Sequence, residues 1–386
     1  MVSVNYNNSV AKEDLSFGLS LMSHLGEGNV PISPISIRTA LSMLYEGAKG
    51  DSARQIARTA LLPEDKTIRY EEFREISDAL KESNSSYTLK FANGFWVDNQ
   101  YPVNDDFQTT LKNNYMAESK SVNFKENPDG ERSRINNWVK EKTQGKIPDI
   151  LSPGTINSLT VLVLANALYF KADWQNKFNP EFTRKQDYTL SSGKTIKVDM
   201  MRKGSIDSRN LPQFLYKEFD GVQLVMLPYK YGSPLIKMVM LPPKKTSVKD
   251  LEFYLMDNKT SIQDLNQRLK IEKFERLEIP KHEVRGSYDL ISPLSKMGID
   301  RIFSLKTAEL SGIADGPLFV GSGKHETYFK TDEEGSEGAA ATVFATLRGF
   351  TPEEHISFVA DRPFLEAVID GKTGACLFLN RIEDPR

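Results

Sequence analysis

The chain has 386 residues, of which 39% are hydrophobic and 26% are charged, and its formal net charge is −2. This is the composition of a globular protein with enough chain to bury a large core. The near-neutral charge argues against a nucleic acid partner, because phosphate binding needs a clustered excess of basic residues. No apolar run approaches the length of about 18 residues that a membrane-spanning helix needs, so we expect no membrane span.

The first half of the chain carries helical patterns. Apolar residues recur at helical spacing over 12–25. Ser33 followed by Pro34 is a start signal for a second helix, because serine caps a helix N-terminus and proline suits its first turn. Two more helices are predicted over 67–83 and 131–143.

Strand patterns interrupt the first half and dominate the second. Runs rich in β-branched and aromatic residues predict strands at 87–97, 160–170, 219–229, 235–242, 355–360, 363–370 and 374–382. The run TVLVLANALYF at 160–170 is apolar on both faces, so it is predicted to be a central strand that is covered on both sides. The densest basic run, 268–273, has interleaved acids and is interpreted as the solvated face of a helix. Without internal repeats, the pattern predicts one mixed α+β domain spanning 1–386.

The sequence offers no complete catalytic or metal-binding pattern. Its four histidines lack ligand spacing: His24, His282, His325 and His355. The sequence around Ser336 is GSEG, which does not match the nucleophile elbow of hydrolases. In VGSGKHE, Lys324 is followed by histidine, which does not match the phosphate-loop pattern. The single cysteine, Cys376, lies in an apolar run and is predicted to be a buried thiol. We therefore expect no catalytic residue, no metal and no cofactor, and we predict that the protein is not an enzyme.

A tract of small residues near the end of the chain needs an explanation. Residues 331–354 read TDEEGSEGAAATVFATLRGFTPEE. Every second residue from Ser336 is small at four of five positions: Ser336, Gly338, Ala340, Thr342 and Phe344. In a strand these side chains share one face, so the tract is suited both to an exposed loop and to a strand that slips between existing strands.

Several separated blocks of the sequence resemble the serpins, a family of serine and cysteine protease inhibitors. These blocks are 29–50, 89–97, 135–151, 160–174, 333–342 and 360–370. The resemblance implies an α+β fold of three β-sheets with about nine helices, and an exposed reactive-centre loop at about 333–357. It also implies suicide inhibition, in which a protease attacks the loop, forms an acyl-enzyme and is trapped when the cut loop inserts into the main sheet.

The resemblance extends through the hinge of the loop. The matching residues are Glu333, Glu334, Gly335, Ser336, Glu337, Gly338, Ala339, Ala340, Ala341 and Thr342. Ser336 stands at the first inserted position, where the family has threonine or serine. Non-inhibitory relatives, which serve as carriers, chaperones or storage proteins, usually have a charged, bulky or proline residue in this stretch. The hinge therefore favours an inhibitor, and a non-inhibitory serpin is the alternative.

The resemblance also assigns residues to the region where the sheet opens. Ser33, Ser36, Asn166 and His325 match a polar cluster beneath the point where the strands part, and Trp174 matches the tryptophan where the loop first enters. The predicted helix over 131–143 matches the helix that lies across the sheet.

Four scissile bonds are compatible with the loop sequence. Arg348-Gly349 suits a trypsin-like protease, because a carboxylate in its specificity pocket binds the guanidinium strongly. The usual spacing of the family instead places the scissile residue at Gly349, which suits a small-pocket, elastase-like enzyme. Phe350 or Leu347 would suit a chymotrypsin-like enzyme. Arg348 is favoured because it is the only basic residue between Thr331 and Arg362.

The implied partner is a serine protease in a covalent complex, and we expect the chain to be a monomer. The predicted helix over 67–83 is net acidic, so we do not expect it to bind a glycosaminoglycan. The start MVSVNYNNSVAKED is too polar for a signal peptide, and glycosylation sequons occur at Asn7, Asn84 and Asn258. We expect a secreted glycoprotein from which a signal peptide has been removed, with a cytoplasmic protein as the alternative.

Overall fold

The structure is a computed structural model that describes residues 10–81, 87–115, 117–203, 211–230, 233–335 and 355–386. The described helices are α1 Val10–Met22, α2 Pro34–Gly47, α3 Gly50–Thr59, α4 Lys66–Lys81, α5 Asp105–Asn114, α6 Pro128–Lys142, α7 Val248–Asp257, α8 Ile262–Asn266 and α9 Ile291–Met297. The described strands are β1 Val30–Ile32, β2 Tyr87–Asp98, β3 Glu118–Val122, β4 Leu162–Ala172, β5 Arg184–Thr189, β6 Thr195–Lys203, β7 Gln213–Phe219, β8 Val222–Pro228, β9 Leu235–Leu241, β10 Lys270–Pro280, β11 His282–Asp289, β12 Ser322–Thr331, β13 Ile356–Val359, β14 Phe364–Asp370 and β15 Cys376–Ile382.

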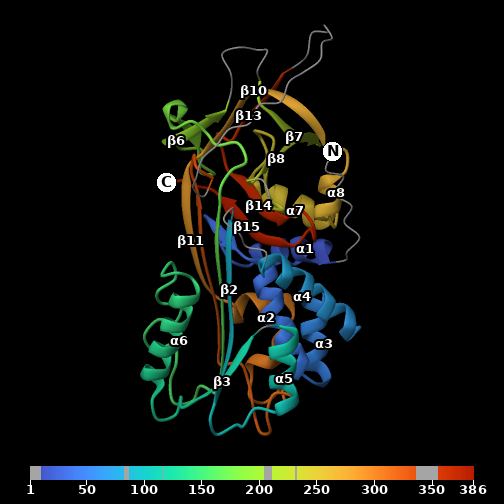
Figure 1. The fold of residues 1–386 in the computed structure, drawn as a ribbon, viewed down its shortest axis with the longest axis vertical. Coiled ribbons are helices and arrows are strands. Elements are labelled where there is room, and N and C mark those ends of the chain that lie inside the picture. Colours follow the sequence, from blue (N-terminus) through green and yellow to red (C-terminus); the bar gives the residue numbers. More distant parts are fainter. Residues whose placement is uncertain (1–9, 82–86, 116, 204–210, 231–232, 336–354) are drawn as a thin grey trace.

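A five-stranded sheet runs along the long axis of the molecule in the order β11-β12-β4-β2-β3 (Figure 1). Its middle strand β4 is buried at every position except Lys171, which confirms the prediction of a strand covered on both sides. Helix α6 packs across one face of this sheet, and α2 packs behind the other face (Figure 1). Helix α2 begins as predicted, because Ser33 caps it and Pro34 occupies its first turn.

A second, ten-stranded sheet follows the order β1-β15-β14-β9-β8-β7-β10-β6-β5, with β13 also paired to β10. The first residues of β10 pair with β7, whereas its last residues pair with β6. Strand β10 therefore divides this sheet into two parts, which together with the five-stranded sheet make the three sheets expected from the sequence. Only Lys281 separates β10 from β11, so one extended segment runs through both sheets.

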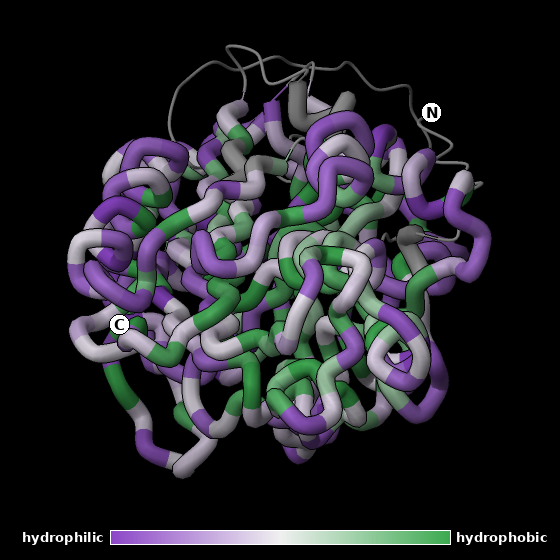
Figure 2. The backbone as a smooth tube through the Cα atoms, turned by 90° about the horizontal axis from the view of Figure 1, so that it is seen from below, coloured by the Kyte–Doolittle hydropathy of each residue, from purple (hydrophilic) through white to green (hydrophobic). Residues whose placement is uncertain are grey.

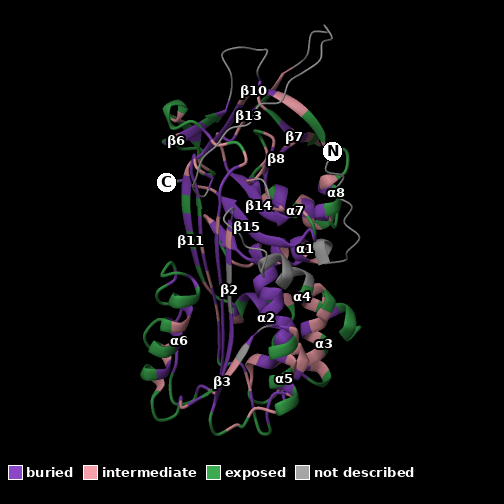
Figure 3. Cartoon of the chain, in the orientation of Figure 1, coloured by how far each residue is buried: buried purple, intermediate pink, exposed green. Residues whose placement is uncertain are grey.

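Three groups of buried apolar side chains form the core. One lies between the helices and both sheets, a second lies between the two sheets around Phe170, Phe329 and Phe378, and a third lies under α6 around Trp96 and Ile135. The hydropathy of the backbone follows this arrangement, with apolar segments inside and polar segments at the rim (Figure 2). Helix α2 is buried along nearly its whole length, whereas α6 exposes its outer side (Figure 3).

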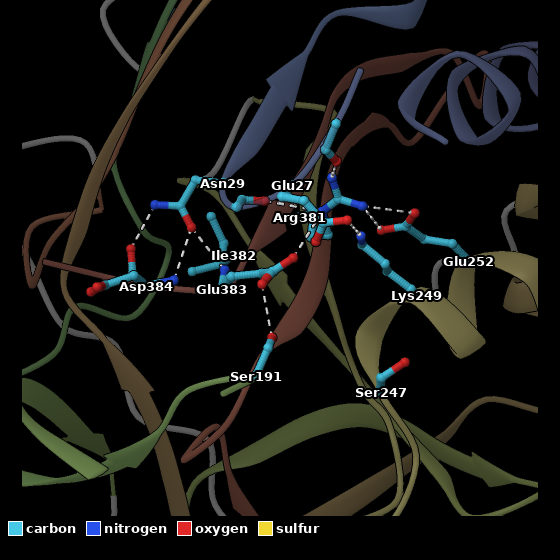
Figure 4. Close-up of polar contacts among 12 residues, drawn as sticks. Glu27, Asn29, Ser191, Ser247, Lys249, Glu252, Arg381, Ile382, Glu383 and Asp384 are labelled. Carbon is cyan, nitrogen blue, oxygen red and sulfur yellow. Dashed lines mark hydrogen bonds and ion pairs between the residues drawn. The ribbon is translucent and has the colours of Figure 1, made fainter. Parts of the chain in front are cut away.

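The C-terminal strand is anchored by a buried arginine (Figure 4). The Arg381 guanidinium is paired with Glu252 of α7 at 3.2 Å, and it donates to the carbonyl oxygens of Gly28, at 3.1 Å, and Gly26. Asn29 accepts hydrogen bonds from the backbone nitrogens of Glu383 and Asp384. Residues from both ends of the chain are thereby joined around β1 and β15.

Two sequence expectations differ from the structure. The basic run at 268–273 is not a helix: Arg268 has a φ of 61° and Lys270 begins β10, whose polar first residues pair with β7. The predicted strand at 219–229 begins only at Val222, because Asp220 and Gly221 have φ values of 48° and 77° and form the hairpin turn between β7 and β8.

Cys376 is buried and unpaired, as predicted. Among the described helices, none combines the length and the apolar character that crossing a bilayer requires.

Candidate functional site

The parallel seam between β4 and β12 is the centre of the site. The two strands pair from Ser322 opposite Val163 to Thr327 opposite Leu168. Strand β12 continues to Thr331, and its antiparallel pairing with β11 extends to that residue. Within the described chain, the last four residues of β12 therefore have a strand partner on one side only.

A tight turn follows β12 and ends the described part of the hinge. The backbone nitrogens of Asp332 and Gly335 donate to each other's carbonyl oxygens, at 3.3 and 3.2 Å. Gly335 has a φ of 110°, and a Cβ atom there would lie 2.2 Å from the backbone nitrogen of Trp174. Only glycine fits this position, because both the left-handed backbone and the close approach exclude a side chain.

Two hinge glutamates are fixed by partners on neighbouring segments. Glu333 accepts from Lys281 at 2.8 Å and from the Thr183 hydroxyl at 2.6 Å. Burial raises the pKa of Glu333, but the hydrogen bonds from Lys281 and Thr183 outweigh burial and lower it overall. Glu334 is paired with Lys177. The chain is thus held by charge directly after the end of β12.

Trp174 joins the end of β4 to the hinge. Its indole Nε1 donates to the carbonyl oxygen of Asp332 at 2.9 Å. Its backbone nitrogen donates to the carbonyl oxygen of Glu334 at 3.2 Å. Its ring stacks on Tyr229 with centroids 4.8 Å apart. The structure therefore places Trp174 against the backbone of Asp332 and Glu334, beyond the last paired residues of the β4–β12 seam.

Four of the predicted site residues lie together in one buried cluster. Asn166 Oδ1 accepts from the Ser36 hydroxyl at 2.7 Å and lies 3.0 Å from His325 Nδ1. His325 Nε2 accepts from the backbone nitrogen of Ser33 at 3.1 Å, so the ring proton resides on Nδ1 and is donated to Asn166. Burial lowers the pKa of His325 to about 3, which keeps the ring neutral. Since Asn166 and His325 are register partners on β4 and β12, this cluster bonds the seam from below.

A second buried cluster was not predicted from the sequence. Lys237 of β9 is 2.5 Å from Glu366 of β14, and Lys237 also donates to the Thr331 hydroxyl at 2.6 Å. Glu366 further contacts His282 of β11 at 3.0 Å. Burial raises the pKa of Glu366, but the charge of Lys237 and the hydrogen bonds from Lys237 and His282 outweigh burial and lower it to about 2. We call Lys237, Glu366, His282 and Thr331 the Lys237 cluster.

The remaining site predictions fall partly outside the described residues. These undescribed positions are Asn7, Asn84, Ser336, Glu337, Gly338, Ala339, Ala340, Ala341, Thr342, Leu347, Arg348, Gly349 and Phe350. Asn258 is exposed, and its side-chain nitrogen donates to the carbonyl oxygen of Tyr254 at 2.8 Å. In the described part of the chain, no group of three or more His, Cys, Asp or Glu residues is placed to hold a metal ion.

Comparison with known proteins identifies the class to which this fold and site belong. The sequence profile of the serpins, described as serine protease inhibitors, matches residues 12–385. The chain therefore belongs to the serpin family. This membership, together with relatives that are named as elastase inhibitors, supports protease inhibition as the general function.

Individual relatives cover nearly the whole chain. The leukocyte elastase inhibitor of Bos taurus is 35% identical over 95% of this chain and 96% of its own length. An uncharacterized serpin-like protein of Thermococcus kodakarensis is 34% identical over 96% of this chain and 84% of its own length. Among solved structures, serpin-12 of Manduca sexta superposes with a TM-score of 0.83 at 27% identity, covering 97% of this chain and 98% of its own. The Arabidopsis AtSerpin1 in its native stressed conformation gives a TM-score of 0.85 at 26% identity, covering 98% of this chain and 99% of its own.

Proposed function

We propose that the chain is an inhibitory serpin, which traps a serine protease as a covalent acyl-enzyme by inserting its cleaved loop between β4 and β12. The protease attacks the exposed loop as it would a substrate, and its serine becomes acylated by the loop. Insertion of the cut loop then carries the protease away before water can release it.

The geometry of the seam is the observation that carries this proposal. Strands β4 and β12 are parallel. The chain leaves β12 at Thr331 and turns back through Asp332 and Gly335, so a strand formed by the loop would run antiparallel to both neighbours. One short parallel ladder would be replaced by two antiparallel ladders, which are somewhat more stable per residue. The loop would then supply the second strand partner that the last residues of β12 do not have within the described chain.

The energy gained is large enough to distort a protease. At about 1 kcal/mol net for each added hydrogen bond, an inserted strand contributes on the order of 10 kcal/mol. That is comparable to the whole folding stability of a typical domain, about 5–15 kcal/mol. An acylated protease that is pulled against the end of the sheet can therefore lose the geometry of its active site.

We propose a trypsin-like target and attack at Arg348-Gly349, because Arg348 offers the only cationic anchor between Thr331 and Arg362. An elastase-like target, cut after Gly349, is the second candidate, and the names of the leukocyte elastase inhibitors among the relatives favour it.

The test is incubation of the protein with trypsin, chymotrypsin and pancreatic elastase, followed by denaturing electrophoresis and sequencing of the released C-terminal peptide. The proposal expects an SDS-resistant complex with trypsin and a fragment that begins GFTPEEHISF. Arg348→Ala should abolish the trypsin complex and leave the behaviour towards elastase unchanged. Cleavage of the loop by every protease without any complex would instead favour a non-inhibitory serpin.

A further inference from the structure

The Lys237 cluster lies beneath the part of β12 that has no strand partner on the β4 side among the described residues. Pairing with β4 stops at Thr327, four residues before the strand ends at Thr331. The Thr331 hydroxyl points into the interior and accepts from Lys237, whose side chain is completely buried. The Lys237 ammonium also lies 5.1 Å from the ring of Phe329 and 5.8 Å from that of Trp174. One side chain thus lies against both the end of β12 and Trp174, the second residue after β4.

The cluster binds the edge of one sheet to the other sheet through two contacts. His282 and Thr331 are register partners on β11 and β12. Thr331 is bonded to Lys237 on β9, and His282 is bonded to Glu366 on β14. Neither contact involves β4, so the upper end of the β11–β12 pair is fixed independently of the seam.

Stability alone does not account for a buried charged cluster at this place. Removing an ion pair from water costs several kcal/mol per ion, and apolar residues of similar volume usually stabilise a core equally well or better. What a buried pair can supply instead is a fixed geometry, because each buried charge is stable only beside its partner. Asn380 contributes to that arrangement by donating to Glu366 at 2.9 Å.

We propose that Lys237 is a positioning residue that holds the last residues of β12, which pair only with β11 in the described chain, so that the entrance between β12 and β4 is formed before the loop inserts. This inference rests on the proposed function for its kinetic consequence, but the positioning itself is measurable without any protease.

The positioning is tested by hydrogen exchange of the peptide that contains 328–331. Thr331→Val keeps the shape of the side chain and removes the acceptor of the Lys237 hydrogen bond. Opening of this end should then become about fivefold more frequent, which corresponds to a lost hydrogen bond of about 1 kcal/mol. Thr327→Val is the matched control, because Thr327 is a buried threonine on the same strand that donates to Pro31 at 2.8 Å and still pairs with β4. The control should change exchange at 328–331 by less than twofold.

A second variant separates positioning from stability. Lys237→Met combined with Glu366→Gln removes both charges and leaves an amide for His282 and Asn380. We expect its thermal midpoint to stay within a few degrees of that of the parent protein, whereas exchange at 328–331 rises as in Thr331→Val. Unchanged exchange in both variants, or an equal increase in Thr327→Val, would overturn the proposal.

The kinetic consequence is read from the stoichiometry of inhibition with trypsin. Insertion competes with hydrolysis of the acyl-enzyme, so a β12 end that is poorly held should slow insertion and let more inhibitor be cleaved without trapping a protease. The number of inhibitor molecules consumed per protease should therefore rise by about twofold or more in Thr331→Val and stay unchanged in Thr327→Val. An unchanged stoichiometry with faster exchange would refute the role of Lys237 in insertion. Absence of any complex in the parent protein would refute the proposed function, while the exchange data would still decide the positioning.

Discussion

Acidification should destabilise the folded protein through His325. In the native state this ring accepts a hydrogen bond from Ser33 and is fully buried, and burial lowers its pKa to about 3 from an ordinary value of 6.5. The unfolded chain takes up a proton near pH 6.5, whereas the folded chain does not until about pH 3. The stability that the neutral ring contributes is therefore complete above pH 6.5 and is lost as the pH falls. Between pH 6.5 and 5.0 the loss is about 2 kcal/mol, at about 1.4 kcal/mol per pH unit.

The assay is urea unfolding of the parent protein and of His325→Gln between pH 7.5 and 5.0. Glutamine does not titrate, yet its side-chain oxygen can still accept a hydrogen bond from the Ser33 nitrogen. Glu252 acts in the opposite direction. Burial raises its pKa to about 6 in spite of the charge of Arg381, so its contribution to the free energy of unfolding becomes more favourable as the pH falls below 6. That term is common to both proteins and cancels in their difference. Parallel pH profiles for the two proteins would refute the reasoning.

Three further substitutions test the hinge and the core. Gly335→Ala should lower the free energy of unfolding by about 2 kcal/mol or more, because its Cβ would lie 2.2 Å from a backbone nitrogen at a φ of 110°. Gly26→Ala is its control, with a φ of 100° and no atom within 4 Å, and it should cost only about 1 kcal/mol in the same urea titration. Ser336→Arg should turn the inhibitor into a substrate, because an unpaired charge buried in the sheet costs several kcal/mol, and gels should show cleaved protein in place of complex. Arg381→Met leaves Glu252 buried without its cation, so the free energy of unfolding should fall by about 3–5 kcal/mol in a urea titration. A fall below about 1 kcal/mol would contradict the anchoring role of the Arg381–Glu252 pair.

Local patterns predicted the elements that are uniform along their length. Strand β4 was recognisable because both of its faces are apolar, and α2 because Ser33 and Pro34 mark its start. The run at 268–273 was misinterpreted because its charges lie at the exposed end of a long strand, where charge composition does not distinguish a strand from a helix.

The site was less accessible to sequence reasoning because its residues come from distant segments. Ser36, Asn166 and His325 meet only after three elements have packed, and the resemblance to a family was needed to group them. The Lys237 cluster did leave a signal. Lys237 is the single charge in the apolar strand β9, and Glu366 lies in the middle of β14, whose only other charge is Asp370 at its end. A charge within such an apolar run must find a partner once the run is buried.

The pairing of β1 with β15 sets a limit on when this protein can fold during its synthesis. Val30 pairs with Arg381, so two strands at opposite ends of the chain are neighbours in one sheet. At about 5–20 residues per second, a ribosome needs roughly 20–70 s to make the intervening chain. Throughout that interval β1 has no partner, and the carbonyl oxygens of Gly26 and Gly28 lack the guanidinium that they will bind. We expect nascent chains to depend on chaperones for that interval and to reach the native state only after β15 has left the exit tunnel.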